Sequence, residues 1–265
     1  VLAAADPRDP AAQKRPASLP TDYLPFLEQS SLKGKRLGRL KALEGYHPRV
    51  DRLMEETTLR LRQAGAEVVD ISDPLPEGMD DASFEVLLTE FKEGLNRYLA
   101  RRSKDCLIHS LEDLKAFNEK DPVELRFFDQ ALVLQALERG GLDDPGYQKS
   151  LAQMLTLARR EGIDHLLSHY HLDALIAPTG APAWVTDPVN GDHFMGGSSS
   201  LAAIAGTPHI TLPMGMIDGL PVGLSLMGAA WSEGPLIGIA AGVEQTLKAR
   251  RPPLYLPTLN LPPQP

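Results

Sequence analysis

The strongest constraint on the fold is a strand–helix–strand pattern near the start of the chain. Lys35–Lys41 and Glu67–Ile71 have strand character, and Pro48–Ala64 between them repeats apolar side chains at three- and four-residue steps along one helical face. Gly65 then suits the left-handed end of a helix. Two strands joined by a helix form a βαβ unit, which implies a parallel pair and a right-handed crossover. The sequence therefore predicts an α/β fold.

The remainder of the chain adds further strands and helices to this unit. Ser110, with Asp113 three residues later, gives a capping-box-like start to one helix. A last helix begins after Ser232 and ends before Pro252. Together these signals predict a mixed β-sheet core flanked by helices, with a helical insertion. The other expected helices are Ser83–Arg101, Leu111–Asn118, Pro122–Glu138, Pro145–Tyr170 and Ser198–Ala205, and the other expected strands are Ala174–Ala177, Ile210–Leu212 and Val222–Met227.

Proline marks both ends of the chain. Of its 23 prolines, five fall in residues 1–25 and six in residues 252–265, so the ends are expected to be extended and the folded body to lie between them. We expect residues 1–30 to be an extended lead-in that reads as an internal loop of a longer parent chain. Residues 31–251 are expected to form the C-terminal part of a single α/β domain, mostly helical over 83–170, followed by a Pro-rich tail.

Charge and cysteine content exclude several classes of protein. Acidic residues outnumber basic ones, 35 against 27, and the net charge of −8 argues against a nucleic-acid-binding surface. The single cysteine, Cys106, excludes an internal disulfide framework, has no partner motif for catalysis and fits a reducing compartment, so we expect a cytoplasmic location. No apolar run reaches the ~18 residues of a membrane span. No glycine-rich stretch matches a nucleotide-binding motif, and no cofactor is expected.

One segment, Thr179–Gly197, does not fit the pattern of a helix or a strand. It is rich in glycine and proline and carries two large aromatic side chains, Trp184 and Phe194. An irregular loop of about 20 residues is uncommon in a compact domain and is often a binding loop. We therefore expect this segment to form part of a ligand site.

Two other features invite a chemical interpretation, and in each the plainer one is favoured. His165 and His169 stand four residues apart, as zinc ligands on a helix do, but no glutamate follows the first histidine. Exposed histidines at a helix end are favoured over a metal site. Ser199, within the run Gly196–Ser200, lacks the nucleophile-elbow pattern and has only a distant His209 as a base. A helix cap or a binding surface is favoured there.

Several segments together resemble the amidase signature family. The Pro-Thr strand end, the Ala-Gly-x-Pro segment and the Gly-Leu-Pro-Val-Gly run occur in the order that family members show. The stretch EFKEGLNRYLA and the RRPP after the last helix resemble its peptide amidase-like branch. The resemblance covers almost the whole chain and rests on LKGKRLGRL (32–40), LRQAGAEVVDI (61–71), EFKEGLNRYLA (90–100), LDALIAPTGAPAW (172–184), SSSLAAIAGTPHITLPMG (198–215) and GLPVGLSLMGAAWSEGPLIGIAAGVEQ (219–245).

The resemblance implies hydrolysis of a carboxamide, of a peptide or a small amide, through a serine acyl-enzyme. The family's catalytic set is a nucleophilic serine, a second serine in a cis peptide link and a lysine, and no segment here resembles the runs that carry them. We therefore assign no catalytic residue and no metal ligand, and expect the chain to be inactive alone. Ala203 stands where many members have Asn. The predicted substrate-pocket wall consists of Pro178, Thr179, Gly180, Trp184, Phe194, Gly196, Gly197, Ser198, Ser199 and Trp231.

The expected partners follow from this interpretation. They are the missing N-terminal catalytic segment of the same protein and a small amide or peptide substrate, with no nucleic acid and no membrane span. Loss of the N-terminal half would expose an apolar sheet face and favour an oligomer. The alternative is a stand-alone binding or scaffold protein of amidase-like fold without catalysis.

Overall fold

The computed structural model describes residue 8 and residues 12–255. The rest of the lead-in and the end of the Pro-rich tail lie outside these described residues. The chain divides into two compact units. The first contains the chain up to Leu75, Arg159–Thr186 and everything from Asp192 onward, and the second contains Pro76–Ala158 with Asp187–Gly191.

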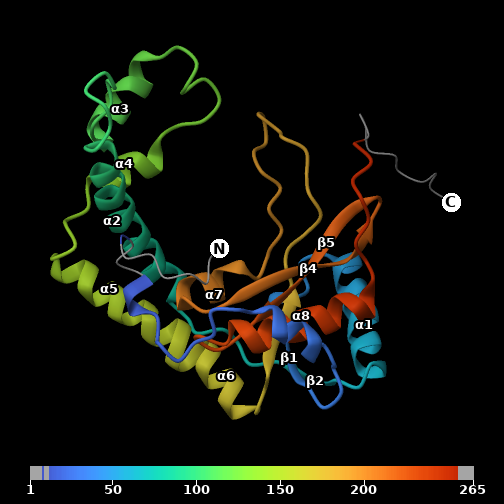
Figure 1. Ribbon diagram of the computed structural model, residues 1–265. Coiled ribbons are helices and arrows are strands. Elements are labelled where there is room, and N and C mark those ends of the chain that lie inside the picture. The colour runs from blue at the N-terminus through green and yellow to red at the C-terminus, as the bar shows by residue number, and fades with distance from the viewer. Residues whose placement is uncertain (1–7, 9–11, 256–265) are drawn as a thin grey trace. The chain divides into compact units, whose positions relative to one another are not determined.

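The first unit is built on one mixed five-stranded sheet (Figure 1). Its strand order is β2-β1-β3-β5-β4. β1 lies parallel to both β2 and β3, whereas β5 runs antiparallel to β3 and to β4. The predicted βαβ unit and the α/β class are confirmed. The strands are β1 (Arg36–Leu40), β2 (Glu67–Ile71), β3 (Ala174–Pro178), β4 (His209–Ile217) and β5 (Leu220–Met227).

Two helices cover one face of this sheet. They are α1 (Pro48–Gln63) and α8 (Glu233–Leu247), and both contribute buried side chains to the main hydrophobic core. Gly65 follows α1 with a φ of +97°, the left-handed conformation expected of a helix stop. Alternate strand residues point into this core because side chains alternate across a strand. The core includes Leu37, Val50, Met54, Leu61, Ile176, Leu224, Leu226, Leu236, Ile239 and Val243.

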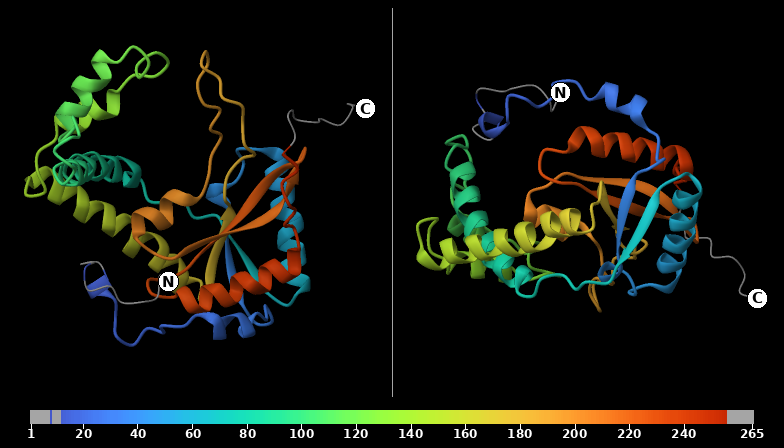
Figure 2. Two further views of the ribbon diagram at one scale, coloured as in Figure 1. Left: turned by 45° about the horizontal axis from the view of Figure 1, so that its top comes forward. Right: turned by 90° about the horizontal axis from the view of Figure 1, so that it is seen from below.

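The N-terminal segment, residues 24–32, lies along α8, as both views in Figure 2 show. Its 3₁₀-helix η2 (Leu24–Gln29) packs on α8, where glycines recur every fourth residue at Gly234, Gly238 and Gly242. A Cβ at Gly238 would lie 2.9 Å from the carbonyl oxygen of Phe26. The missing side chains therefore let the backbone of the segment approach the helix directly. Shorter 3₁₀ turns are η1 (Ala12–Lys14) and η3 (Lys41–Leu43).

An ionic cluster around a buried arginine lies at the carboxyl end of β1. Arg39, with only 1% of its side chain exposed, binds Glu44 through two hydrogen bonds of 2.6 and 2.7 Å and binds Glu55 at 2.7 Å. Lys41 also pairs with Glu44, at 2.7 Å. Burial by itself lowers the pKa of Arg39, but hydrogen bonds and attraction from the two glutamates outweigh it and raise that pKa. The guanidinium therefore stays charged inside the unit.

The second unit is helical. Its small core joins Leu88, Leu111 and Ala136 from three different helices. Ser110 caps its helix as predicted, because its hydroxyl oxygen accepts from the backbone N–H of Asp113 at 3.0 Å. The helices are α2 (Met79–Leu99), α3 (Leu111–Lys120), α4 (Ala131–Leu137) and α5 (Pro145–Leu155).

Three element predictions were wrong in extent. The helix expected over Pro122–Glu138 is confined to α4. The helix expected over Pro145–Tyr170 is α5, then a π-helical stretch, Thr156–Ile163, then α6 (Asp164–His169), and Gly162 departs from helical φ/ψ. The strand expected at Ile210–Leu212 extends to nine residues as β4 and carries an irregularity between Pro213 and Gly215.

The apolar sheet face expected to be exposed is buried on β3 and β5, whereas Met216 on the edge strand β4 is exposed. Leu175, Ala177 and Met227 point away from α1 and α8 and are nevertheless completely buried. Large exposed apolar side chains lie mainly in the second unit and on the irregular loop, among them Phe84 and Leu87 on α2 and Phe128 between α3 and α4. Among the described residues, no helix is long and apolar enough to cross a membrane.

Candidate functional site at the carboxyl end of strand β3

The irregular loop begins and ends at one point on the sheet, just after β3 (Figure 1). Gly180 and Gly197 form an isolated antiparallel bridge that closes its base. On the sheet side, the N–H of Thr179 donates to the carbonyl of Gly223 at 2.8 Å, and the N–H of Ser198 donates to the carbonyl of Thr179 at 3.2 Å. The structure thus brings together Thr179, Gly180, Gly197 and Ser198, four of the residues of the expected pocket wall.

Two glycines at this base are required by close contacts. Gly196 has a φ of +145°, and a Cβ there would lie 2.7 Å from Cδ1 of the Tyr46 ring. A Cβ at Gly223 would lie 2.7 Å from Oγ1 of Thr179. Burial raises the pKa of Tyr46 to about 12, so its phenol is neutral at physiological pH. The base of the loop is therefore packed against Tyr46 on one side and against β5 on the other.

Three polar side chains form a row that crosses the sheet beneath this base. Oγ1 of Thr179 lies 2.9 Å from Oγ of Ser225, which lies 2.7 Å from Nε2 of His209. Ser225 has 0% of its surface exposed, whereas Thr179 and His209 are half-buried. Burial lowers the pKa of His209, so its ring is neutral near pH 7. Sequence reasoning does not single out Ser225, whose only signal is a hydroxyl within the apolar run of β5.

Ser198 and Ser199 mark the start of α7 (Ser199–Ala205). Ser198 occupies the N-cap position, but its side chain makes no capping hydrogen bond. Its Oγ is buried, with 1% of the residue exposed, and has no hydrogen-bond partner in the part of the chain that the structure describes. Ser199 faces solvent. Of the two alternatives favoured for this run, a helix cap or a binding surface, the cap is thus not made by the side chain of Ser198.

The loop carries an aromatic pair. The ring centroids of Trp184 and Phe194 lie 6.2 Å apart in an edge-to-face arrangement, and the indole N–H of Trp184 donates to Asp192 at 3.2 Å. The two side chains are 40% and 70% exposed. At the tip, a carboxylate oxygen of Asp187 accepts from the backbone N–H of Val189 at 2.9 Å and of Asn190 at 3.0 Å. These contacts give the loop a defined shape and leave an apolar surface open.

Pro178 and Trp231 lie in different places relative to this base. Pro178 is the last residue of β3 and directly precedes Thr179. Trp231, with a φ of +64°, follows the other end of β5. Pro178 pairs with Leu224 and Leu175 pairs with Met227, the last residue of β5, so this end of β5 is about 10 Å along the strand from Leu224. Trp231 follows beyond that end. The structure does not bring Trp231 together with the other predicted residues.

The alternative sites gain no support from the described residues. The rings of His165 and His169 stack 5.3 Å apart, and no group of three or more potential metal ligands occurs among the residues that the structure describes. Cys106 is half-buried, and its thiol donates to the carbonyl of Ile108 at 3.3 Å. These are ordinary structural contacts.

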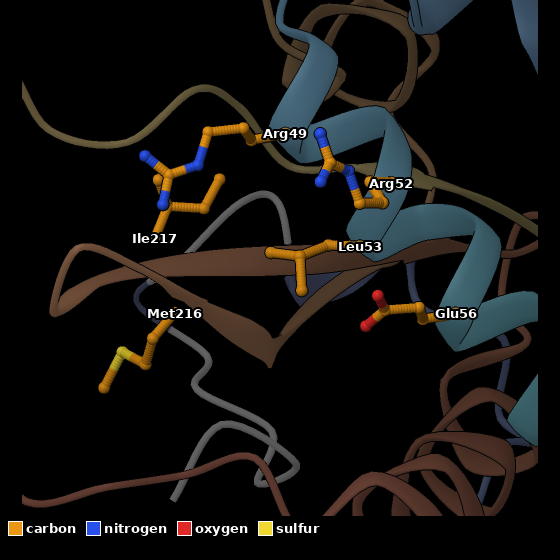
Figure 3. A pocket seen from close by; sticks show the side chains of 6 residues that line it. All are labelled: Arg49, Arg52, Leu53, Glu56, Met216 and Ile217. Carbon is orange, nitrogen blue, oxygen red and sulfur yellow. The ribbon is translucent and has the colours of Figure 1, made fainter. Parts of the chain in front are cut away.

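A separate shallow pocket of about 140 Å³ lies between α1 and the end of β4 (Figure 3). The guanidinium of Arg49 beside it binds the carboxylate of Asp218 with distances of 2.5 and 2.8 Å. This ion pair holds α1 against the hairpin turn, where Asp218 and Gly219 both have positive φ, as a two-residue turn requires. None of the predicted wall residues lines the pocket, which is formed by Arg49, Arg52, Leu53, Glu56, Met216 and Ile217.

Comparisons with known proteins give one consistent family. The family model described as Amidase matches residues 1–237. A probable amidase of Arabidopsis thaliana is 31% identical over 260 residues, which are 95% of this chain and 46% of that protein. The native peptide amidase of Stenotrophomonas maltophilia is 43% identical with a TM-score of 0.84, over 94% of this chain and 50% of that one. A peptide amidase complexed with the competitive inhibitor chymostatin is 42% identical with a TM-score of 0.87, over 94% and 51%. The chain therefore spans about half the length of the relatives it matches.

Proposed function

The chain belongs to the amidase family, and we propose that it is the C-terminal part of an enzyme that hydrolyses a carboxamide of a peptide or a small amide. The observation that carries this proposal is the 42–43% identity to peptide amidases over 94% of the chain, with TM-scores of at least 0.84. Since both relatives are peptide amidases, a peptide amide is favoured among the possible substrates.

The proposed reaction is acyl transfer to a serine outside this chain. The serine oxygen attacks the carboxamide carbon, a C–O bond forms, the C–N bond breaks, and the departing nitrogen takes up a proton. Water then hydrolyses the acyl-enzyme and releases the carboxylic acid. In this proposal a lysine acts as base through a second serine, and backbone N–H groups stabilise the oxyanion. This chain contributes no group that makes or breaks a bond.

The contribution of this chain is the wall of the substrate pocket. The bridged base of the loop supplies main-chain groups and the Thr179 hydroxyl, which suit the polar carboxamide. The exposed pair Trp184 and Phe194 supplies an apolar surface that suits the side chains of a peptide. We leave Trp231 out of this wall because it lies beyond the other end of β5.

Ammonia release from peptide C-terminal amides tests the proposal. We expect the 265-residue chain alone to be inactive and the complete product of its gene to release one ammonia for each amide hydrolysed. Turnover by the chain alone would refute the assignment of catalysis to residues outside it. A complete gene product that binds peptide amides without turning them over would instead support a binding protein of amidase-like fold.

A further inference from the structure

We propose that Thr179 binds the carboxamide of the substrate and that Ser225 and His209 are positioning residues that orient its hydroxyl. This inference rests on the proposed function. It starts from the sheet register, in which Ser225 pairs with both Ala177 and Thr211. Because side chains two residues apart share a strand face, Thr179, Ser225 and His209 all lie on the same face of the sheet.

The row is connected because the sheet leaves room for it. Thr179 pairs through its N–H with Gly223, where a Cβ would lie 2.7 Å from the Thr179 hydroxyl and 2.8 Å from the Thr211 methyl. A side chain at this position would separate Thr179 from Ser225. The glycine thus allows a hydroxyl at the edge of the loop base to reach a completely buried serine.

The direction of the hydrogen bonds among His209, Ser225 and Thr179 depends on which nitrogen of His209 carries the proton. A serine hydroxyl has one proton to donate, and a neutral imidazole donates through one nitrogen and accepts through the other. When Nε2 of His209 carries the proton, it donates to Ser225, Ser225 donates to Thr179, and the Thr179 proton is free for a ligand. When Nδ1 carries the proton, Nε2 accepts from Ser225, Ser225 accepts from Thr179, and Thr179 offers a ligand only lone pairs.

Either direction of this relay matches one half of a carboxamide. A Thr179 hydroxyl that donates suits the carbonyl oxygen, and one that accepts suits the N–H₂ group. Thr179 is half-buried at the loop base, and its hydroxyl, which contacts Ser225, has the capacity for a second hydrogen bond. Ser225 and His209 act only through Thr179, since Ser225 has no exposed surface.

The test uses Thr179→Val, Thr179→Ser, Ser225→Ala and His209→Gln in the complete gene product, with an N-acetylated dipeptide amide as substrate. We expect Thr179→Val to raise KM roughly tenfold with kcat unchanged, as loss of one uniform binding contact does. Thr179→Ser should restore most of the loss. Thr211→Val is the matched control, because Thr211 lies on the same face and loses the same group, and its KM should not change.

The role of His209 is tested by a double-mutant cycle. We expect Ser225→Ala and His209→Gln each to raise KM about threefold and the double variant to be no worse than Ser225→Ala alone. Additive effects would refute a role through Ser225, as an unchanged KM in Thr179→Val would refute the contact itself.

A readout without turnover separates this inference from the proposed function. In the 265-residue chain labelled with ¹⁵N-histidine, we expect the Nε2 shift of His209 to change in Ser225→Ala and in Thr179→Val but not in Thr211→Val. If these shifts change while the gene product hydrolyses no amide, the relay stands and the proposed function and substrate contact fail. If the shifts do not change, the relay is refuted whatever the enzyme does.

Discussion

Replacing Gly242 by alanine tests whether the N-terminal segment is seated on α8 as described. In an exposed helix interior this substitution stabilises by about 1 kcal/mol, because alanine loses less backbone freedom on folding than glycine. At Gly242 the new methyl would lie well within 3.0 Å of the carbonyl oxygen of Ser30, a separation that Cβ atoms do not tolerate. The obstacle is backbone, so either the segment or the helix must shift.

The net effect follows from these two opposing terms. Overpacking of this kind costs about 1–3 kcal/mol, and the contact at Gly242 is the shortest of those at the three α8 glycines. Because this contact is the shortest, the cost lies in the upper part of that range, about 2–3 kcal/mol, and subtracting the gain of about 1 kcal/mol in helix propensity leaves a loss of about 1–2 kcal/mol. At Gly238 the nearest atom, the backbone carbonyl oxygen of Phe26, is 2.9 Å away, so Gly238→Ala should also destabilise, but less than Gly242→Ala. Gly94 in α2 has nothing within 4 Å, so Gly94→Ala should stabilise by about 0.5–1 kcal/mol.

Urea denaturation provides the assay. Trp184 and Trp231 both belong to the first unit, so tryptophan fluorescence reports the unit that contains α8. Far-UV circular dichroism follows Gly94→Ala in the helical second unit. A loss of about 1–2 kcal/mol corresponds to a Tm lower by roughly 2–8 °C in a unit of this size. A Gly242→Ala chain as stable as the unsubstituted one, with an unchanged m-value, would refute the seating of the segment on α8.

Two further predictions concern charged groups. Arg39→Met should destabilise by about 3–5 kcal/mol, because it leaves the buried carboxylate of Glu44 short of its main partner, and a second change, Glu44→Met, should recover most of the loss in the same denaturation assay. A single variant as stable as the double would contradict this. Hydrogen bonds from the backbone of His109 and the hydroxyl of Ser110 lower the pKa of Asp113 below 3.8. The ionised carboxylate therefore stabilises α3 at pH values above its pKa in the unfolded chain, and this stabilisation is lost as the pH falls through its pKa in the folded chain. Carbon-13 NMR titration of the Asp113 carboxyl should give a midpoint below 3.8. In the Asp113→Asn variant this carboxyl is absent, so acidification should no longer cause the loss of helicity that its protonation causes in the unsubstituted chain.

The sequence predicted the elements whose signals are local. The apolar stripe of α1 and its glycine stop are properties of neighbouring residues, and the structure reproduces them. The failed helix over Pro122–Glu138 shows where local signals compete. Asp121 accepts from the N–H of Val123 at 2.8 Å and Asp129 from that of Ala131 at 2.9 Å, and such side-chain bonds offer the backbone an alternative to the helix. Apolar periodicity alone does not show this competition between side-chain and helical hydrogen bonds.

The strand β4 was underestimated for a different reason. Pro213 and Gly215 resemble chain breakers, and in a central strand they would be. β4 is an edge strand of the sheet, however, and its irregularity between these residues accommodates the backbone donor that Pro213 lacks. Whether a strand is central or at an edge depends on the order of the whole sheet, which no window of sequence contains.

The same dependence on sheet order separates the predicted part of the site from the missed part. The loop base was predictable, because Thr179 directly follows a strand and the glycines beside it are close in sequence. Ser225 lies 46 residues from Thr179 and 16 from His209, and only the antiparallel registers of β3, β4 and β5 bring the three side chains to hydrogen-bond distance. A shift of either register by one residue would move Ser225 to the apolar core between the sheet and its helices. The identity of the polar row is thus fixed by strand pairing, and the same pairing places Gly223 where Thr179 must reach across.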